Sequence, residues 1–140
     1  DTVINQDTDD KTGSTAVTFN VDPTYTVTIP GTVTLEKTGT DAVTYEQDLT
    51  ITADAGMRLK SGESVQVTMA SDFTMNSIEG SSLTYTVTAN DQEIKNNGVV
   101  ATFTTNTASQ NSTLHFAAND PEYAGNYSDT VTFTLSVVNN

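Results

Sequence analysis

The chain contains no cysteine and no tryptophan, a single histidine, and 5 basic residues against 18 acidic ones. Without cysteine there can be no disulfide, no thiolate nucleophile and no zinc site of the cysteine type. The formal net charge of −13 repels nucleic-acid phosphates and anionic lipid surfaces, so we expect neither as a partner. The same charge favours solubility.

Long apolar runs and helix-forming segments are also missing. No apolar run approaches the roughly 20 residues of a membrane span, so we expect no membrane insertion of the chain. About one residue in five is instead threonine, whose branched, stiff side chain suits a strand and disfavours a helix. The composition therefore predicts an all-β domain. Since the chain begins at Asp1 rather than Met, we expect a mature chain that is secreted, extracellular or displayed on the cell surface.

The clearest strand lies at the end of the chain, after the turn at Ala124–Gly125. From Thr130 onward, Thr and Ser alternate with the apolar residues Val131, Phe133, Leu135 and Val137. Side chains on a strand point to opposite faces with a period of two, so one face here is apolar and the other carries hydroxyls. This pattern predicts a half-buried strand that closes a sheet whose outer face meets water.

Shorter alternating segments recur along the chain and are separated by turn residues. They lie at residues 15–21, 25–29, 43–53, 64–69, 83–88, 99–105 and 114–116. Strands spaced by roughly 8–12 residues are typical of a sandwich of two antiparallel sheets. We therefore predict an Ig-like or jelly-roll-like antiparallel β-sandwich of about eight or nine strands.

The first residues differ from the rest of the chain. Residues 1–14 are polar and contain only Val3 and Ile4 as large apolar residues, so alone they should be disordered. We therefore divide the chain into an N-terminal extension, residues 1–14, and a sandwich domain, residues 15–140.

No residue stands out as catalytic. His115 lies between Leu114 and Phe116 and should point away from the core, and no nucleophile elbow or phosphate-binding loop accompanies it. We therefore expect no enzyme activity, no catalytic residue and no cofactor. Calcium is the one alternative, since it takes oxygen ligands from acidic loops. Two groups of carboxylates qualify: Asp7, Asp9 and Asp10, and Asp120, Glu122 and Asp129.

The five tyrosines could either pack in the core or form a platform that stacks against sugars. Tyr25, Tyr45 and Tyr85 are in phase with core residues, which favours packing over a sugar-stacking platform. Tyr127 precedes the last strand, where sandwiches often place a corner tyrosine that bonds nearby backbone.

Two runs carry a resemblance to a known group of proteins. Residues Tyr25–Leu35 begin with Tyr-x-Val-x-Ile-Pro, and residues Ala124–Val137 contain Ala-Gly-x-Tyr-x-x-Thr-Val-x-Phe. Together they resemble the Thr-rich, cysteine-free surface domains of Gram-positive bacteria, either pilin-like or matrix-fibre-like. The resemblance implies one β-sandwich framed by these two strands and a cell-wall, matrix or fibre role. It supplies no catalytic residue.

Two functions follow as expectations. The first is a structural subunit of an extracellular fibre or pilus, a head-to-tail homopolymer in which an N-terminal segment joins the open sheet of a neighbour. The donor residues would be Val3, Ile4, Val17, Phe19 and Val21. The receiving edge would be Val131, Phe133, Leu135 and Val137. The alternative is a monomeric adhesin or carbohydrate-binding module.

Overall fold

Ten β-strands and no helix make up the computed structural model, which describes residues 1–140. The strands are β1 (Val27–Thr28), β2 (Glu36–Thr38), β3 (Thr44–Ala53), β4 (Glu63–Ala70), β5 (Thr74–Asn76), β6 (Ser82–Ala89), β7 (Gln92–Glu93), β8 (Gly98–Phe103), β9 (Gln110–Asn119) and β10 (Thr132–Asn139). There are ten strands rather than eight or nine because short pieces such as β1 and β7 pair separately with longer strands. No part of the chain forms a helix long and apolar enough to cross a membrane.

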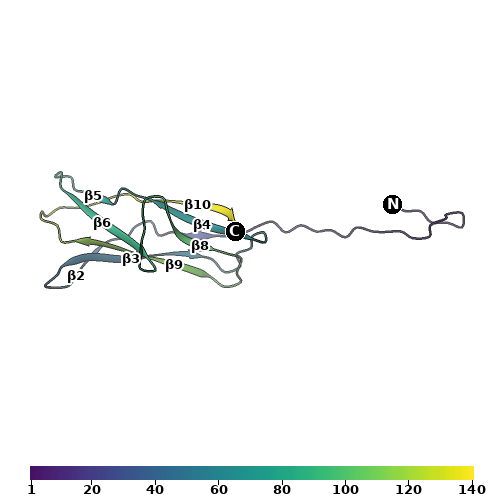
Figure 1. Ribbon diagram of the computed structural model, residues 1–140, viewed down its shortest axis with the longest axis horizontal. Helices are drawn as coiled ribbons and strands as arrows, with labels where there is room; N and C mark the ends of the chain where they lie inside the picture. Colours follow the sequence, from purple (N-terminus) through teal and green to yellow (C-terminus); the bar gives the residue numbers. More distant parts are fainter.

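The strands form two antiparallel sheets (Figure 1). The larger has the order β1-β3-β9-β6-β5, with β2 also paired to β3 and β7 to β6; the smaller has the order β10-β4-β8. The longest ladder joins β3 to β9 and runs from Thr44 opposite Asn119 to Ala53 opposite Gln110. This arrangement confirms the predicted all-β, Ig-like sandwich, and it leaves β10 at an edge of the smaller sheet.

The core lies between the two sheets and follows from the alternation within each strand. On β4, Val65, Val67 and Met69 point inward and are 0% exposed. On the outer face of the larger sheet, hydroxyls pair instead, as Thr50 and Thr113 do across β3 and β9 at 3.0 Å. The abundant threonine therefore covers the surface of the sheets, while valine, leucine and phenylalanine fill the interior.

The N-terminal residues leave the body as a long extended tail (Figure 1). The first pairing in the chain is the bridge between Thr24 and Arg58, so the tail comprises residues 1–23. Residues 15–21, whose alternation predicts a strand of the sandwich, belong to no sheet. Because no strand of this chain lies beside them, Val17 and Phe19 remain 92% and 89% exposed.

One local prediction is confirmed at the loops. Tyr127 donates a hydrogen bond from its hydroxyl to the backbone oxygen of Tyr123 at 2.7 Å, as expected of a corner tyrosine. This contact is local in sequence, which is why the sequence pattern could predict it. In the segment that joins β6 to β8, Ile94 is buried.

Candidate functional site

The edge strand β10 is incompletely covered. It pairs only with β4, in the register Phe133–Met69, Leu135–Val67 and Val137–Val65. The β4 members of these pairs are fully buried, whereas Phe133 and Leu135 are half-buried and Val137 is 43% exposed. The apolar face of β10, at the edge of the sheet, is therefore more open to solvent than that of the central strand β4.

Apolar side chains at the edge of the larger sheet are also incompletely buried. Val27, Ile29, Val33 and Leu35, from β1 and the segment leading to β2, are only partly buried against the core. At the end of the body where β10 begins lies a cavity of about 530 Å³. Val33 and Val131 line it together, so it lies between the edges of the two sheets. Val131 lines this cavity, but no residue of β10 itself does. We call the cavity, together with the partly exposed apolar face of β10, the β10 groove.

A buried tyrosine fixes the wall of the β10 groove. The Tyr85 ring lies 5.8 Å from that of Phe73 and stacks on that of Phe116 at 6.1 Å. Its hydroxyl donates to Asp129 Oδ2 at 2.6 Å and also contacts Ser71 Oγ at 2.6 Å. Burial, followed by the hydrogen bond to Asp129, raises the pKa of Tyr85 above its ordinary value. These bonds tie β6 to the β9–β10 loop and hold the mouth of the groove in place.

Four of the five tyrosines gather at the β10 groove. They are Tyr45, Tyr85, Tyr123 and Tyr127. Tyr85 is a core residue, as its phase predicts. Tyr25, in contrast, is 42% exposed and does not belong to the core. The hydroxyls of Tyr85 and Tyr127 already donate to groups of this chain. The tyrosines thus form a wall of the groove rather than a flat platform on a sheet.

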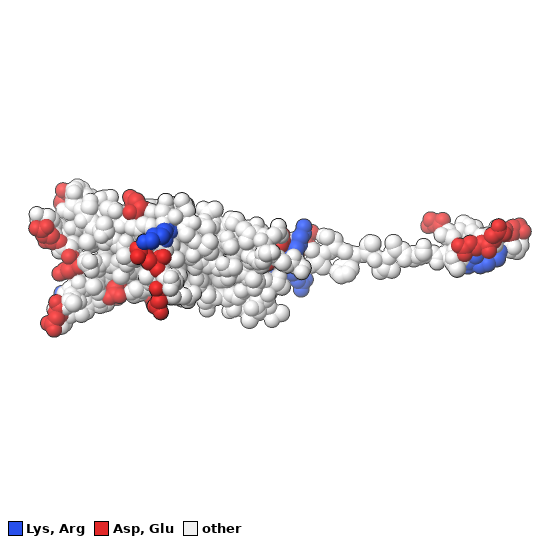
Figure 2. Space-filling model, in the orientation of Figure 1, with Lys and Arg blue, Asp and Glu red and all other residues white.

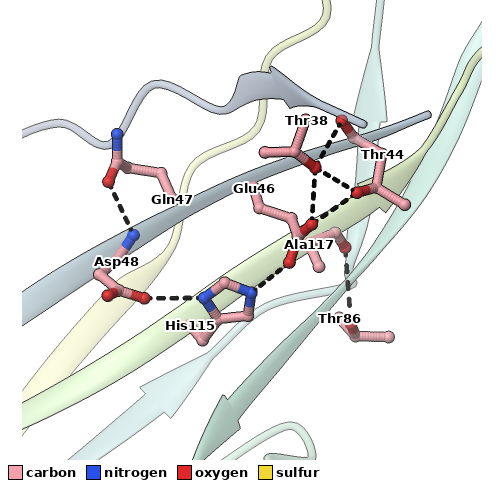
Figure 3. A network of polar contacts seen from close by, with 8 residues as sticks. All are labelled: Thr38, Thr44, Glu46, Gln47, Asp48, Thr86, His115 and Ala117. Carbon is pink, nitrogen blue, oxygen red and sulfur yellow. Dashed lines mark hydrogen bonds and ion pairs between the residues drawn. The ribbon is translucent and has the colours of Figure 1, made fainter. Parts of the chain in front are cut away.

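The single histidine lies on the outer face of the larger sheet (Figure 3). Its Nε2 is 2.6 Å from Glu46 Oε1 and its Nδ1 is 2.7 Å from Asp48 Oδ1. The hydrogen bond to Asp48, and then that to Glu46, raises the pKa of His115. Hydrogen bonds from Thr44, and then His115, lower the pKa of Glu46 to about 2. The predicted surface position is confirmed, but no local pattern shows the two carboxylates, because they reach His115 through the pairing of β3 with β9.

The carboxylates named for calcium do not come together. The structure contains no group of three or more His, Asp or Glu side chains that could hold a metal ion. Asp129 accepts hydrogen bonds from Tyr85 and Ser71 at the groove, while Asp10 accepts from Thr12 within the tail. Each of these two acids, one from either candidate group, is thus hydrogen-bonded to hydroxyl groups of its own chain.

The residues predicted for assembly occupy two distinct places. Val131, Phe133, Leu135 and Val137 lie together at the β10 groove. Val3, Ile4, Val17, Phe19 and Val21 are all exposed, and all lie in the tail. The tail thus holds half of the ten exposed large apolar residues of the chain. The residues that sequence reasoning missed are those of the opposite wall, such as Val33 and Met75, because partial burial leaves no mark in the alternation.

No family model and no curated protein matches the chain. Two solved structures do. One is a chaperone–tip adhesin complex of CFA/I fimbriae, with 16% identity and a TM-score of 0.52 over 80% of this chain. The other is the CsuC–CsuE chaperone–tip adhesion subunit pre-assembly complex from the archaic chaperone–usher Csu pili of Acinetobacter baumannii, with 19% identity and a TM-score of 0.52 over 82% of this chain.

The chain spans about 41% and 40% of the matched chains' lengths, so it corresponds to a part of each. At these identities the likeness concerns the fold. Nothing in it supports a Gram-positive group, which the sequence resemblance implied; the similar structures come from chaperone–usher fimbriae and pili. The chain has an immunoglobulin-like β-sandwich fold that it shares with components of pilus assembly.

Proposed function

We propose that this chain is a non-enzymatic structural subunit of an extracellular fibre or pilus, assembled by insertion of one subunit's tail into the β10 groove of the next. The observation that supports this is the incomplete burial of β10. A single added strand would cover Phe133 and Leu135 and would give partners to the free backbone groups of the β10 edge.

The tail has the pattern that such a strand needs. Val17, Phe19 and Val21 share one side of an extended segment and are exposed to water in the isolated chain. Each gains roughly 1.5–3 kcal/mol when it is fully buried. An insertion that buries all three, and that also covers the half-buried residues of β10, has a substantial driving force.

The resulting contact joins two different surfaces of the same molecule. Such a heterologous contact repeats without closing whenever its rotation does not form a ring, and it then yields a filament. The likeness to chaperone–tip subunit complexes supports a pilus-related role for the chain. The homopolymer is the more specific part of the proposal.

The test compares two triple variants of the full chain by size-exclusion chromatography and electron microscopy. Val17→Thr, Phe19→Thr and Val21→Thr together remove the apolar face of the tail while preserving β propensity, so we expect monomers. The matched control is Ala16→Ser, Thr18→Ser and Asn20→Ser, which changes only the opposite face and should still form fibres. Fibres from the first variant would refute the proposal.

One observation favours a second function, a carbohydrate-binding module. Four tyrosines line the β10 groove, and aromatic rings often pack against sugars. A chain of this kind would stay monomeric, would bind oligosaccharides, and would lose that binding on Tyr123→Ala. If the tail peptide and an oligosaccharide did not compete for the groove, the two functions would use different surfaces.

A further inference from the structure

We propose that the incoming tail runs antiparallel to β10 with Val21 opposite Val131, and that its acidic tip lies against the Arg58–Lys60 loop of the receiving subunit. The acidic tip is residues 1–11, which hold four aspartates and Lys11. This inference rests on the proposed function. To it we add a direction, a register and a second contact outside the groove.

The direction follows from where the tail leaves the body. The tail starts at the end where β10 finishes (Figure 1), because both segments bond to the β3–β4 loop. Thr24 N donates to Arg58 O at 2.9 Å, and Asn140 N donates to Gly62 O at 2.7 Å. A chain's own tail, folded back into its own groove, would therefore run parallel to β10. The tail of a subunit stacked at the opposite end enters where β10 begins and runs antiparallel to it.

Local geometry favours the neighbour's tail. Thr24 is held to Arg58 by two backbone hydrogen bonds, so a fold-back would need to reverse the chain within Asp22–Pro23 and also cross to the other sheet. Sheets in a sandwich lie about 10 Å apart, which two residues do not span while turning. Antiparallel pairing is also slightly more stable per residue than parallel pairing.

The distribution of charge also favours the antiparallel direction over the parallel fold-back. The loops at the end where β10 begins, which precede β3 and β6 and follow β4 and β9, hold five acidic residues: Asp41, Asp72, Glu79, Asp120 and Glu122. Figure 2 shows acidic side chains gathered at the end of the body away from the tail. A fold-back would place the acidic tip among these carboxylates. The antiparallel direction instead carries the tip to the root of the receiving subunit's own tail, where Figure 2 shows basic side chains beside a few acidic atoms.

The basic residues at that root are free to bind the tip. The ion pairs of the chain involve Lys95 and His115, so Arg58 and Lys60 have none. Lys11, the one basic side chain of the tip, is already engaged, since its Nζ donates to the backbone oxygens of Asn5, at 2.6 Å, and Thr8. The tip therefore presents its aspartates, and Arg58 and Lys60 have no partner within their own chain.

The register follows from the pattern of apolar residues. Residues 15–21 of the tail and residues 131–137 of the groove have equal length and the same phase. Placing Val21 opposite Val131 brings Phe19 to Phe133 and Val17 to Leu135. Thr15 then meets Val137, the most exposed receiver.

Other registers of the same phase fit less well. A shift of two residues places either Pro23, which cannot donate to the ladder, or Gly13, which has no side chain, within the segment that covers residues 131–137. In the proposed register, residue 13 reaches Asn139 at the end of β10. Residues 1–11 must then lie beyond the groove, toward the β3–β4 loop.

Engineered cysteines test the direction and the register, because the chain has none of its own. Opposed residues of an antiparallel pair lie about 4.5–5.5 Å apart at Cα, within the range of a disulfide. We expect Val21→Cys with Val131→Cys to give a ladder of covalent multimers on oxidation, and Val21→Cys with Val137→Cys to give none. A crosslinked monomer from the second pair would show a parallel fold-back and overturn the inference.

The outcomes separate this inference from the proposed function. Fibres seen by electron microscopy without a ladder from the first pair would refute the register while the fibre subunit stands. No fibres from the unmodified chain under any tested condition would refute both.

A charge exchange tests the second contact. We expect Arg58→Glu with Lys60→Glu to slow assembly roughly tenfold at low salt and hardly at all at high salt. Adding Asp7→Lys and Asp9→Lys should restore the rate. Lys37→Glu is the matched control, since Lys37 is exposed on β2, and it should leave the rate unchanged. Equal slowing by the control, or no restoration, would overturn the tip contact.

Discussion

Phe19 should dominate the affinity of the tail for the β10 groove. It is 89% exposed in the free chain, so nearly its whole ring is available for burial on insertion. Full burial of a phenylalanine is worth roughly 2–3 kcal/mol, and 1.4 kcal/mol corresponds to a factor of ten in binding. Replacing it with alanine should therefore weaken binding about 30-fold to 100-fold.

The assay uses the body without residues 1–23 and a labelled peptide of residues 12–24. Because the tail contributes no strand to either sheet, its removal leaves the pairing of the body intact. Fluorescence anisotropy then compares the unmodified peptide with the Phe19→Ala and Thr18→Ala peptides. Thr18 points to the opposite side, so its replacement should change the dissociation constant by less than about threefold.

Two results would refute the reasoning. If the Phe19→Ala peptide bound as tightly as the unmodified one, the ring would not enter the groove. If Thr18→Ala weakened binding equally, the tail would not bind as a strand with one inward face.

Three further predictions concern the body itself. Met69→Ala, at a fully buried position, should lower the free energy of unfolding by about 2–5 kcal/mol in urea titrations, while Leu135→Ala on the open edge should cost less than half as much. For His115, whose pKa is raised, the stabilisation is complete below its unfolded value of 6.5 and is lost as pH rises through the folded pKa. For Glu46, whose pKa is lowered, it is present above 4.5 and is lost as pH falls toward about 2. The destabilisation caused by His115→Gln, measured across a pH series, should thus be greatest between these limits. Tyr85→Phe should loosen the β9–β10 loop, lowering unfolding free energy by about 1–2 kcal/mol and weakening tail-peptide binding.

Each of these has a contrary outcome. Equal losses at Met69 and Leu135 would mean that the edge of the monomer is closed. A pH-independent effect of His115→Gln would mean that its bonds to the carboxylates contribute nothing to stability. Unchanged hydrogen exchange in the β9–β10 loop of Tyr85→Phe would show that the Tyr85 hydroxyl does not hold the groove in place.

Period-two alternation is strong enough in this sequence to predict the sandwich and the inward residues of β10. It failed at residues 15–21, because alternation alone does not show whether a partner strand lies within the same chain. It also could not show that Phe133 is half-buried, since an edge strand and a central strand have identical patterns. The bonds of His115 depend on the register of β3 against β9, which separates the partners by 69 and 67 residues. Contacts between residues so far apart in the sequence depend on the tertiary fold, which a local pattern does not show.

The tail also determines how a fibre of these subunits would respond to force. In the proposed fibre, no disulfide can join one body to the next, since the chain has no cysteine, and each joint depends on one inserted strand. A pull along the fibre acts lengthwise on the ladder between the tail and β10, so its hydrogen bonds are loaded together in shear rather than one after another. The strength of the joint is then a matter of the rate at which the strand slides out, and not of the equilibrium affinity alone.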